Sequence, residues 1–314
     1  MIIASVSGGL SSAEMLRRVI ERYGRENVIA VFADVKGDAR SHRRFSPFPL
    51  IDELLHERFG GEAPDLYRFL WQLSYALDIP IVRLEQYNTI FAHQARAKAF
   101  MIRNGNGVNF APCSLYGKRE LIAGWINKTF FMKDRPILAL GFDWAEAARL
   151  KNARHWWSGI VADVVAPLVE KPYLDNMALM QWCESLGIDI PSAYILDFQH
   201  NNCYGGCVEA GIAQFILLRK VRPGVFYYWM WMEQIIQEYI GTESTILRDS
   251  RGGEVNPLSL RKLDEMLKNS TAPKRWESMA DQKGCSCMAT PLFDMSTIPL
   301  QVKTKTHRTI TPCP

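Results

Sequence analysis

The sequence predicts an α/β fold in which a parallel five-stranded sheet has helices on both faces. Short apolar, β-branched runs alternate with segments of helical periodicity along the first half of the chain. The first run, residues 2–6, ends at Ser7-Gly8-Gly9, and a helical pattern begins directly after the turn. Strands that alternate with helices in this way are typical of a parallel sheet covered on both sides.

Four further runs complete the predicted sheet. Residues 28–35 are continuously apolar, as expected of a buried parallel strand, and residues 79–84 and 136–142 give the third and fourth strands. Residues 164–168 are expected at an edge, because Pro167 is poorly tolerated in a central strand. Helices between the strands are predicted over residues 65–77, 89–103 and 115–126.

The pattern changes along the chain and divides it into three parts. Residues 1–173 are predicted to form the α/β domain, with residues 37–63, rich in Gly, Pro, Arg and His, inserted as a loop. Residues 174–290 are mainly helical in pattern, and residues 291–314 are polar and expected to form a flexible tail. The helices of the second part are expected over residues 174–186, 207–220, 225–241 and 258–268.

Composition limits the class of protein. The chain has 314 residues, 48% of them hydrophobic and 22% charged, which is typical of a soluble globular protein. No apolar run is long enough to cross a membrane and no basic segment precedes the first strand, so we expect a cytoplasmic protein without a membrane partner. The net charge of +4 is compatible with a nucleic-acid partner but too small to indicate one.

The turn after the first strand is the first candidate site. Gly8 and Gly9 permit unusual backbone angles and a close approach of the backbone to a ligand. The hydroxyls of Ser7, Ser11 and Ser12 and the free N–H groups of the helix N-terminus would face one point, which favours phosphate. The turn matches neither the Walker A loop nor the dinucleotide motif. The alternative is an ordinary strand-to-helix turn with a serine N-cap.

Several strand ends are expected to meet at this turn. Ligands of open α/β sheets bind outside the carboxyl ends of the strands, near the point where the strand order reverses. The predicted crevice is lined by the ends of the first, second and fourth strands, which carry Ser7–Ser12, Phe32, Ala33 and Asp34, and Gly141 followed by Asp143 and Glu146.

Seven cysteines in a cytoplasmic chain favour metal binding or reactive thiols over disulfides. Cys203 and Cys207 flank a glycine turn, and Cys285 and Cys287 form a second close pair. Four thiolates from two short turns suit zinc or a [4Fe–4S] cluster, and thiolates alone do not decide between the two metals. Four cysteines without metal are the alternative.

Cys113 stands apart from these pairs. It follows Pro112 and precedes Lys118 and Arg119, so a place at a helix N-terminus with nearby cations would lower its thiol pKa. It would then be a nucleophile or a metal ligand. The alternative is a small buried apolar residue, the role that we also expect for Cys183.

The glycine turn resembles the Ser-Gly-Gly-x-Asp-Ser loop of the ATP pyrophosphatases, the PP-loop (adenine nucleotide alpha hydrolase-like) superfamily, except that Ser11 replaces the usual Asp. From about residue 1 to 290 the chain is similar to the bacterial and phage branch of the phosphoadenosine phosphosulfate (PAPS) reductase-like family. The segments that carry the resemblance are residues 31–34, 65–70, 112–114, 118–121, 141–144, 166–168, 201–211, 246–249 and 284–287.

The resemblance implies a PP-loop/HUP-like fold and a function. The enzyme would bind ATP or a related adenylyl nucleotide with Mg²⁺, adenylate a substrate with release of pyrophosphate, and transfer sulfur, with a sulfur-donor protein as partner. The serine loop would hold the phosphates, and the end of strand two the adenine. Asp143 and Glu146 would bind Mg²⁺ or orient the substrate, Lys118 and Arg119 would neutralise phosphate or sulfate, and Cys113 would carry sulfur or serve as an extra cluster ligand.

Two alternatives remain open. A PAPS or APS reductase would fit the family, but this chain has neither the Glu-Cys-Gly-x-His stretch nor the Cys-Cys pair of those enzymes. A zinc-stabilised nucleotide- or nucleic-acid-binding protein without catalysis would fit Ser11 and the basic loops at residues 40–44 and 248–251. The sequence does not indicate the acceptor substrate or the oligomeric state.

Overall fold

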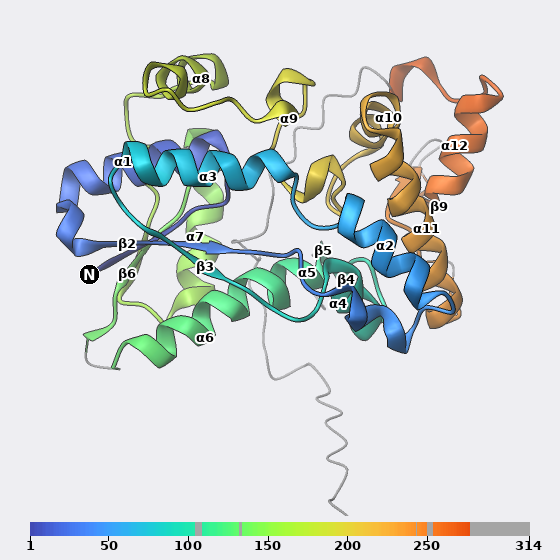
Figure 1. The fold of residues 1–314 in the computed structure, drawn as a ribbon, viewed down its shortest axis with the longest axis horizontal. Coiled ribbons are helices and arrows are strands. Elements are labelled where there is room, and N and C mark those ends of the chain that lie inside the picture. The colour runs from blue at the N-terminus through green and yellow to red at the C-terminus, as the bar shows by residue number, and fades with distance from the viewer. Residues whose placement is uncertain (104–108, 132–133, 243, 250–253, 277–314) are drawn as a thin grey trace, which may run out of the picture.

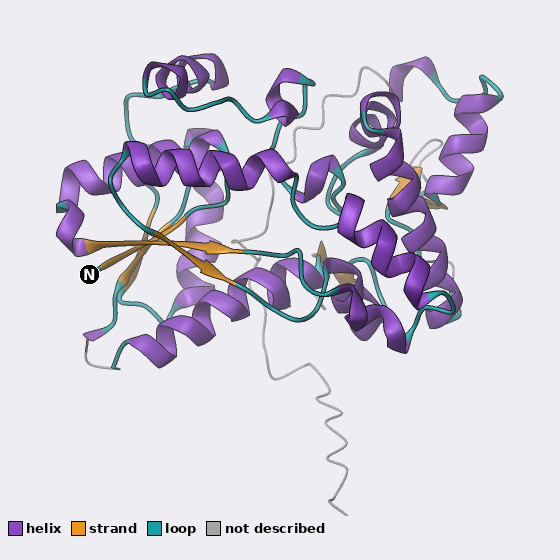
Figure 2. Ribbon diagram, in the orientation of Figure 1, coloured by secondary structure: helices purple, strands orange, loops and turns teal. Residues whose placement is uncertain are grey.

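The computed structural model describes residues 1–103, 109–131, 134–242, 244–249 and 254–276. Its centre is a five-stranded sheet in which every neighbouring pair is parallel, with the strand order β3-β2-β1-β6-β7 (Figures 1 and 2). The predicted parallel α/β sheet is therefore confirmed. Its strands are β1 (Ile2–Ser5), β2 (Val28–Ala33), β3 (Ile81–Leu84), β6 (Ile137–Ala139) and β7 (Asp163–Val165).

Successive side chains of a strand point to opposite faces of the sheet, so the apolar strands present apolar side chains on both faces, and helices cover both. Ala4 of β1 lies in one core with Leu16 and Phe69, whereas Ile3 lies in another core with Trp157. Figure 1 shows the corresponding helices on opposite sides of the sheet. These are α1 (Leu10–Tyr23) and α3 (Pro64–Ala76) on one side, and α6 (Glu120–Thr129) and α7 (Ala147–Trp157) on the other.

The edge position expected for the fifth strand is correct, since β7 pairs only with β6 in the sheet. Pro167 itself lies beyond the strand, at the start of a 3₁₀ turn over Pro167–Val169. The strand ends before the proline, because proline has no N–H to donate to a ladder.

Residues 37–63 are not the loop that their composition indicated. They form a 3₁₀ helix over Ala39–Arg44 and the helix α2 (Pro49–Phe59), which begins with proline in the first turn, where no N–H partner is needed. Nε2 of the fully buried His42 is hydrogen-bonded to the hydroxyl of Thr89 at 2.6 Å, and Nδ1 of His56 is hydrogen-bonded to the hydroxyl of Tyr228 at 3.0 Å. Long-range packing thus orders this segment.

A third core lies outside the sheet. It joins α4, α10, α11 and α12 through large side chains such as Phe91, Phe226 and Trp229. The bounds are α4 (Ile90–Ala97), α8 (Asn176–Ser185), α9 (Ser192–Ile195), α10 (Ile212–Val221), α11 (Pro223–Ile240) and α12 (Leu260–Lys268). Two short antiparallel pairs complete the described elements, β4 (Ile102–Arg103) with β5 (Asn109–Phe110) and β8 (Leu247–Asp249) with β9 (Asn256–Leu258).

None of the helices in the described ranges combines the length and the apolar composition needed to cross a lipid bilayer. The tail predicted over residues 291–314, together with Cys285 and Cys287, lies outside the described residues.

Candidate functional site

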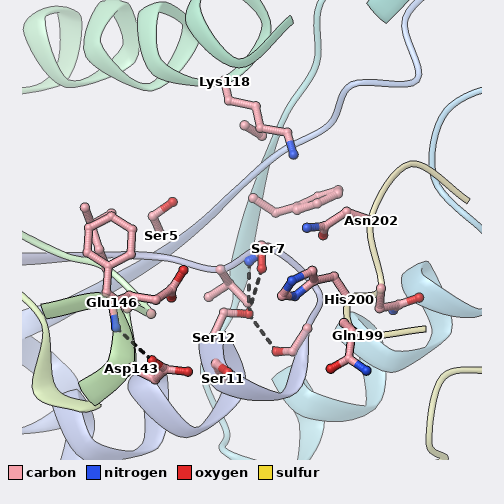
Figure 3. Close-up of a pocket in the computed structure, with 18 of the residues that line it drawn as sticks. Ser5, Ser7, Ser11, Ser12, Lys118, Asp143, Glu146, Gln199, His200 and Asn202 are labelled. Carbon is pink, nitrogen blue, oxygen red and sulfur yellow. Dashed lines mark hydrogen bonds between the residues drawn. The ribbon is translucent and has the colours of Figure 1, made fainter. Parts of the chain in front are cut away.

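The strand order reverses at β1, because the chain proceeds outward through β2 and β3 in one direction and through β6 and β7 in the other. A cavity of about 310 Å³ lies at this switch point, outside the carboxyl ends of β1, β2 and β6. The polar and charged side chains around it are shown in Figure 3. The predicted site residues that line the cavity are Ser7, Gly9, Ser11, Ser12, Phe32, Ala33, Lys118, Gly141, Asp143 and Glu146.

The loop between β1 and α1 is shaped by two close contacts that leave no room for a side chain. Gly8 has a φ of +81°, and a Cβ on it would lie 2.6 Å from the Cγ of Leu66. A Cβ on Gly141 would lie 3.1 Å from the Cα of Ser12. Glycine at these positions lets the loop fit between α3 and the end of β6.

The serine hydroxyls of the loop have different roles. The Oγ of Ser12 accepts hydrogen bonds from the backbone amide of Ser7 at 3.1 Å and from its hydroxyl at 3.2 Å, and it donates to the carbonyl of Gly9 at 2.8 Å (Figure 3). Ser12 therefore stabilises the loop. The backbone amides of Ser11 and Ser12 donate no hydrogen bond within the described part of the chain, so they remain available to a ligand.

Lys118 approaches the same cavity from the opposite side (Figure 3). It lies in a π-helical turn, Leu115–Arg119, that precedes α6. Burial opposes the charged form of Lys118, but Cys203 and Glu62 beside it outweigh this effect and raise its pKa. A half-buried ammonium group therefore faces the serine loop across the cavity.

Two carboxylates lie at another side of the cavity, Asp143 and Glu146 (Figure 3). One oxygen of Asp143 accepts the backbone amides of Ala145 at 2.8 Å and Glu146 at 3.1 Å, which fixes its position. Glu146 is paired with Arg149. Carboxylate oxygens are the ligands that Mg²⁺ prefers, so this pair could hold the ion of a Mg²⁺–nucleotide complex.

Two predicted site residues point elsewhere. The carboxylate of Asp34 is bound by Arg83, with N–O distances of 2.8 and 2.6 Å, and by the hydroxyl of Tyr67 at 3.2 Å. The guanidinium of Arg119 is buried 5.1 Å from the ring centre of Trp156, and burial lowers its pKa to about 10. Neither side chain lines the cavity, and neither does Gly8, whose role is to shape the loop.

Three thiols, those of Cys113, Cys203 and Cys207, lie close enough to Lys118 to interact with its ammonium group. The side chains of Cys207 and Cys113 both lie close enough to Cys203 to interact with its thiol. Burial raises the pKa of Cys113 to about 12, so the expectation of a lowered thiol pKa is wrong. The helix that holds Cys113, Pro112–Ser114, has only three residues, and Cys113 packs against the core outside the sheet. Cys183 is fully buried, as predicted.

The four-cysteine metal site can be examined only in part. Cys203 and Cys207 supply two neighbouring soft ligands, whereas Cys285 and Cys287 lie outside the described residues. Among the residues that the structure does describe, no group of three or more His, Cys, Asp or Glu side chains is arranged to hold a metal ion.

A second set of cavity residues was not predicted from the sequence. Tyr194 comes from α9, and the segment 199–202 follows it and leads directly into Cys203. Asn201 donates from its side-chain amide to the carbonyl of Gly8 at 2.9 Å, which ties this segment to the serine loop. The polar run Gln-His-Asn-Asn before a cysteine was the only available signal in the sequence. The cavity residues of this set are Asn176, Tyr194, Gln199, His200, Asn201 and Asn202.

No protein-family model matches the chain, and no curated protein matches it.

Proposed function

We propose that the cavity binds ATP or a related adenylyl nucleotide, with the phosphates between the serine loop and Lys118. The observation that carries this proposal is the pairing of two free backbone amides, from Ser11 and Ser12 at the N-terminus of α1, with the half-buried ammonium group of Lys118 across one cavity. Free amides at a helix N-terminus attract anions, and an ammonium group adds a full positive charge. Both therefore favour a polyphosphate.

The rest of the cavity suits the other parts of such a ligand. Apolar side chains from Phe32, Ile122 and Leu140 line it beside the polar loop, which is the mixture typical of small-molecule sites. The adenine would lie against the end of β2, near Phe32 and Ala33. Asp143 and Glu146 would hold Mg²⁺, which shields phosphate charge when it is bound.

The proposed reaction is adenylation of a substrate oxygen, after which a sulfide-level nucleophile from a donor protein would form a C–S bond to the activated carbon as its C–O bond to AMP breaks. An oxygen of the substrate would attack the α-phosphorus of ATP, forming a P–O bond as the bond to pyrophosphate breaks. Lys118 and the loop amides would stabilise the negative charge of the departing pyrophosphate. The thiols of Cys203, Cys113 and Cys207 interact with the ammonium group of Lys118, which lines the cavity. The chain would accordingly be a PP-loop enzyme of the PAPS reductase-like kind.

A metal at the thiols is a separate part of the proposal. Zinc or a [4Fe–4S] cluster would need Cys203 and Cys207 together with Cys285 and Cys287. Purification without oxygen, with metal analysis and a visible spectrum, tests this part. About four irons per chain with a broad band near 400 nm would indicate the cluster, one colourless zinc would indicate a structural role, and a metal-free protein would refute both.

One observation favours a nucleotide-binding protein that lacks sulfur chemistry. Cys113 is half-buried against a core and its raised pKa keeps the thiol protonated, so it is a poor nucleophile. ATP binding without release of pyrophosphate in the presence of candidate acceptors would support this alternative. Reduction of PAPS with thioredoxin would instead support the reductase.

The nucleotide site is tested by titration calorimetry with ATP and Mg²⁺. Lys118→Met removes the ammonium group but keeps an apolar stem of similar length, and is expected to weaken ATP binding by about 10- to 100-fold. Lys151→Met on the exposed side of α7 is the matched control and should leave the affinity unchanged. Equal ATP affinities for the wild type and Lys118→Met would refute the proposed phosphate position.

A further inference from the structure

The phenol of Tyr194 lies at the N-terminus of α1, although it is distant in sequence. Its oxygen accepts a hydrogen bond from the backbone amide of Leu10 at 3.0 Å, and Leu10 is the first residue of that helix. The backbone of Asn201 lies close enough to this oxygen to influence its pKa. Tyr194 itself lines the cavity.

This pattern leaves one hydrogen-bonding function of the phenol unused. A phenolic oxygen has two acceptor positions and one O–H donor. The amide of Leu10 is a donor only and uses the oxygen as an acceptor, so the O–H proton is left for a different group. Across the described ranges of the chain, no residue accepts a hydrogen bond from Tyr194.

The phenol is held firmly in this place. A Cβ on Gly9 would lie 3.0 Å from the phenol oxygen, so the loop passes directly beside it. The side chain of Asn201 binds the carbonyl of Gly8 at 2.9 Å, which fixes the loop from the same side. Burial raises the pKa of Tyr194 to about 12, so the hydroxyl keeps its proton at neutral pH.

We propose that Tyr194 is a phosphate-binding residue whose hydroxyl donates a hydrogen bond to a phosphate oxygen of the ligand in the cavity. This inference rests on the proposed nucleotide site and adds to it a residue from the region after the sheet. The phenol takes the amide of Leu10 as a donor and presents its own O–H to the ligand in return. The positive end of the α1 dipole is thereby extended into the cavity.

The class of ligand follows from the neighbouring groups. The amides of Ser11 and Ser12 and the ammonium group of Lys118 are donors without acceptor capacity. A hydroxyl that donates to the same ligand adds a fourth donor. An anionic oxygen with several lone pairs satisfies this set, whereas a neutral ring or an amide does not.

The test compares Tyr194→Phe with the wild type by titration calorimetry, using ATP and adenosine as separate ligands. The substitution removes the hydroxyl and keeps the ring, so ATP should bind about 10- to 100-fold more weakly, because hydrogen bonds to charged groups are the strong ones. Adenosine has no phosphate and should bind equally to both proteins. Tyr173→Phe is the control, since Tyr173 is exposed and does not line the cavity.

The possible outcomes separate this inference from the proposed function. A wild type that binds no ATP refutes both. A wild type that binds ATP while Tyr194→Phe binds it equally well refutes only the role of Tyr194. Equal weakening of ATP and adenosine also refutes that role, because it shows that the hydroxyl only supports the loop.

A second variant covers the case in which Tyr194→Phe does not fold. Replacement of Tyr194 by 3,5-difluorotyrosine keeps the ring and the hydroxyl but makes the phenol a much stronger acid. The affinity for ATP is expected to fall as the pH rises through the ionisation of this residue, while the wild type shows no such loss. Parallel pH profiles for the two proteins would overturn the proposal.

Discussion

The substitution Gly8→Ala tests how the loop of the cavity is held. Gly8 has a φ of +81°, which an L-residue with a side chain rarely adopts. Its new Cβ would lie 2.6 Å from Cγ and 2.8 Å from Cδ1 of Leu66. Leu66 has no exposed surface and packs in the core between α1, α3 and the sheet, so it has no open space into which to move.

The expected loss of stability has two sources. The left-handed backbone costs a residue with a Cβ about 1–2 kcal/mol, and forcing a methyl group into a packed core costs about 1–3 kcal/mol. The lower entropy of alanine in the unfolded chain returns about 0.4–1 kcal/mol. We therefore expect Gly8→Ala to lower the free energy of unfolding by roughly 2–4 kcal/mol.

Urea denaturation of matched variants separates the two sources. Gly187 has a φ of +71° and nothing within 4 Å of an added Cβ, so Gly187→Ala measures the backbone part alone. Gly124 lies inside α6 with equally open space and no positive φ, so Gly124→Ala should stabilise the protein by about 0.5–1 kcal/mol. The ranking from most to least stable is predicted as Gly124→Ala, wild type, Gly187→Ala, Gly8→Ala.

A double-mutant cycle with Leu66→Ala isolates the contact. Leu66→Ala alone is expected to cost about 2–5 kcal/mol, but in that background Gly8→Ala should cost about 1–3 kcal/mol less than in the wild type, because the clash is gone. Additive effects of the two substitutions would contradict the reasoning. So would a Gly8→Ala variant no less stable than Gly187→Ala.

Three further predictions use groups outside the cavity. Asp34→Asn should lower the free energy of unfolding in urea by about 1.5–3 kcal/mol through its partner Arg83, while ATP affinity stays unchanged; weaker ATP binding would contradict this. Glu233 takes up a proton on folding, since burial raises its pKa from 4.5 to about 7. Stability should therefore fall as the pH rises through this window, by on the order of 3 kcal/mol, and Glu233→Gln should flatten that part of a pH series of urea titrations. Cys207 and Cys113 are both half-buried, but the raised pKa of Cys113 keeps its thiol protonated, so iodoacetamide at pH 8 should modify Cys207 first in the native protein. Peptide mass spectrometry follows the reaction, and faster modification of Cys113 would contradict its raised pKa.

The sheet could be predicted from the sequence because its strands are buried on both faces. Such strands appear as unbroken apolar runs, for example residues 28–33, and the glycine turn after β1 marks where a helix begins. The position of the cavity could be predicted from the same pattern, because the carboxyl ends of parallel strands lie at one edge of the sheet. These are local signals, and a single sequence contains them.

The predictions from the sequence that proved wrong share one cause: each depends on contacts between segments that are distant in the sequence. Composition predicted a loop where α2 forms, because the tyrosine that contacts His56 comes from α11. Lys118 and Arg119 are adjacent cations in the sequence, but a helical turn directs one toward the cavity and the other onto Trp156. Asp34 ends the second strand as predicted, yet Arg83 on the neighbouring strand holds its carboxylate away from the cavity. A local sequence pattern does not indicate contacts of this kind, because the two partners lie far apart in the sequence.

The loop after β1 is held by two residues that are distant from it in the sequence, Tyr194 and Asn201. Its carbonyl at Gly8 is bound by Asn201, and the first amide of α1 is bound by Tyr194. The segment that supplies Asn201 continues into Cys203, whose backbone amide is bound by Glu62 near Lys118. The serine loop, the ammonium group and the thiols therefore belong to one hydrogen-bonded and electrostatic unit. A change at the thiols that moves residues 201–203 must move the groups that hold the loop, so the state of the thiols and the occupancy of the cavity are expected to depend on each other.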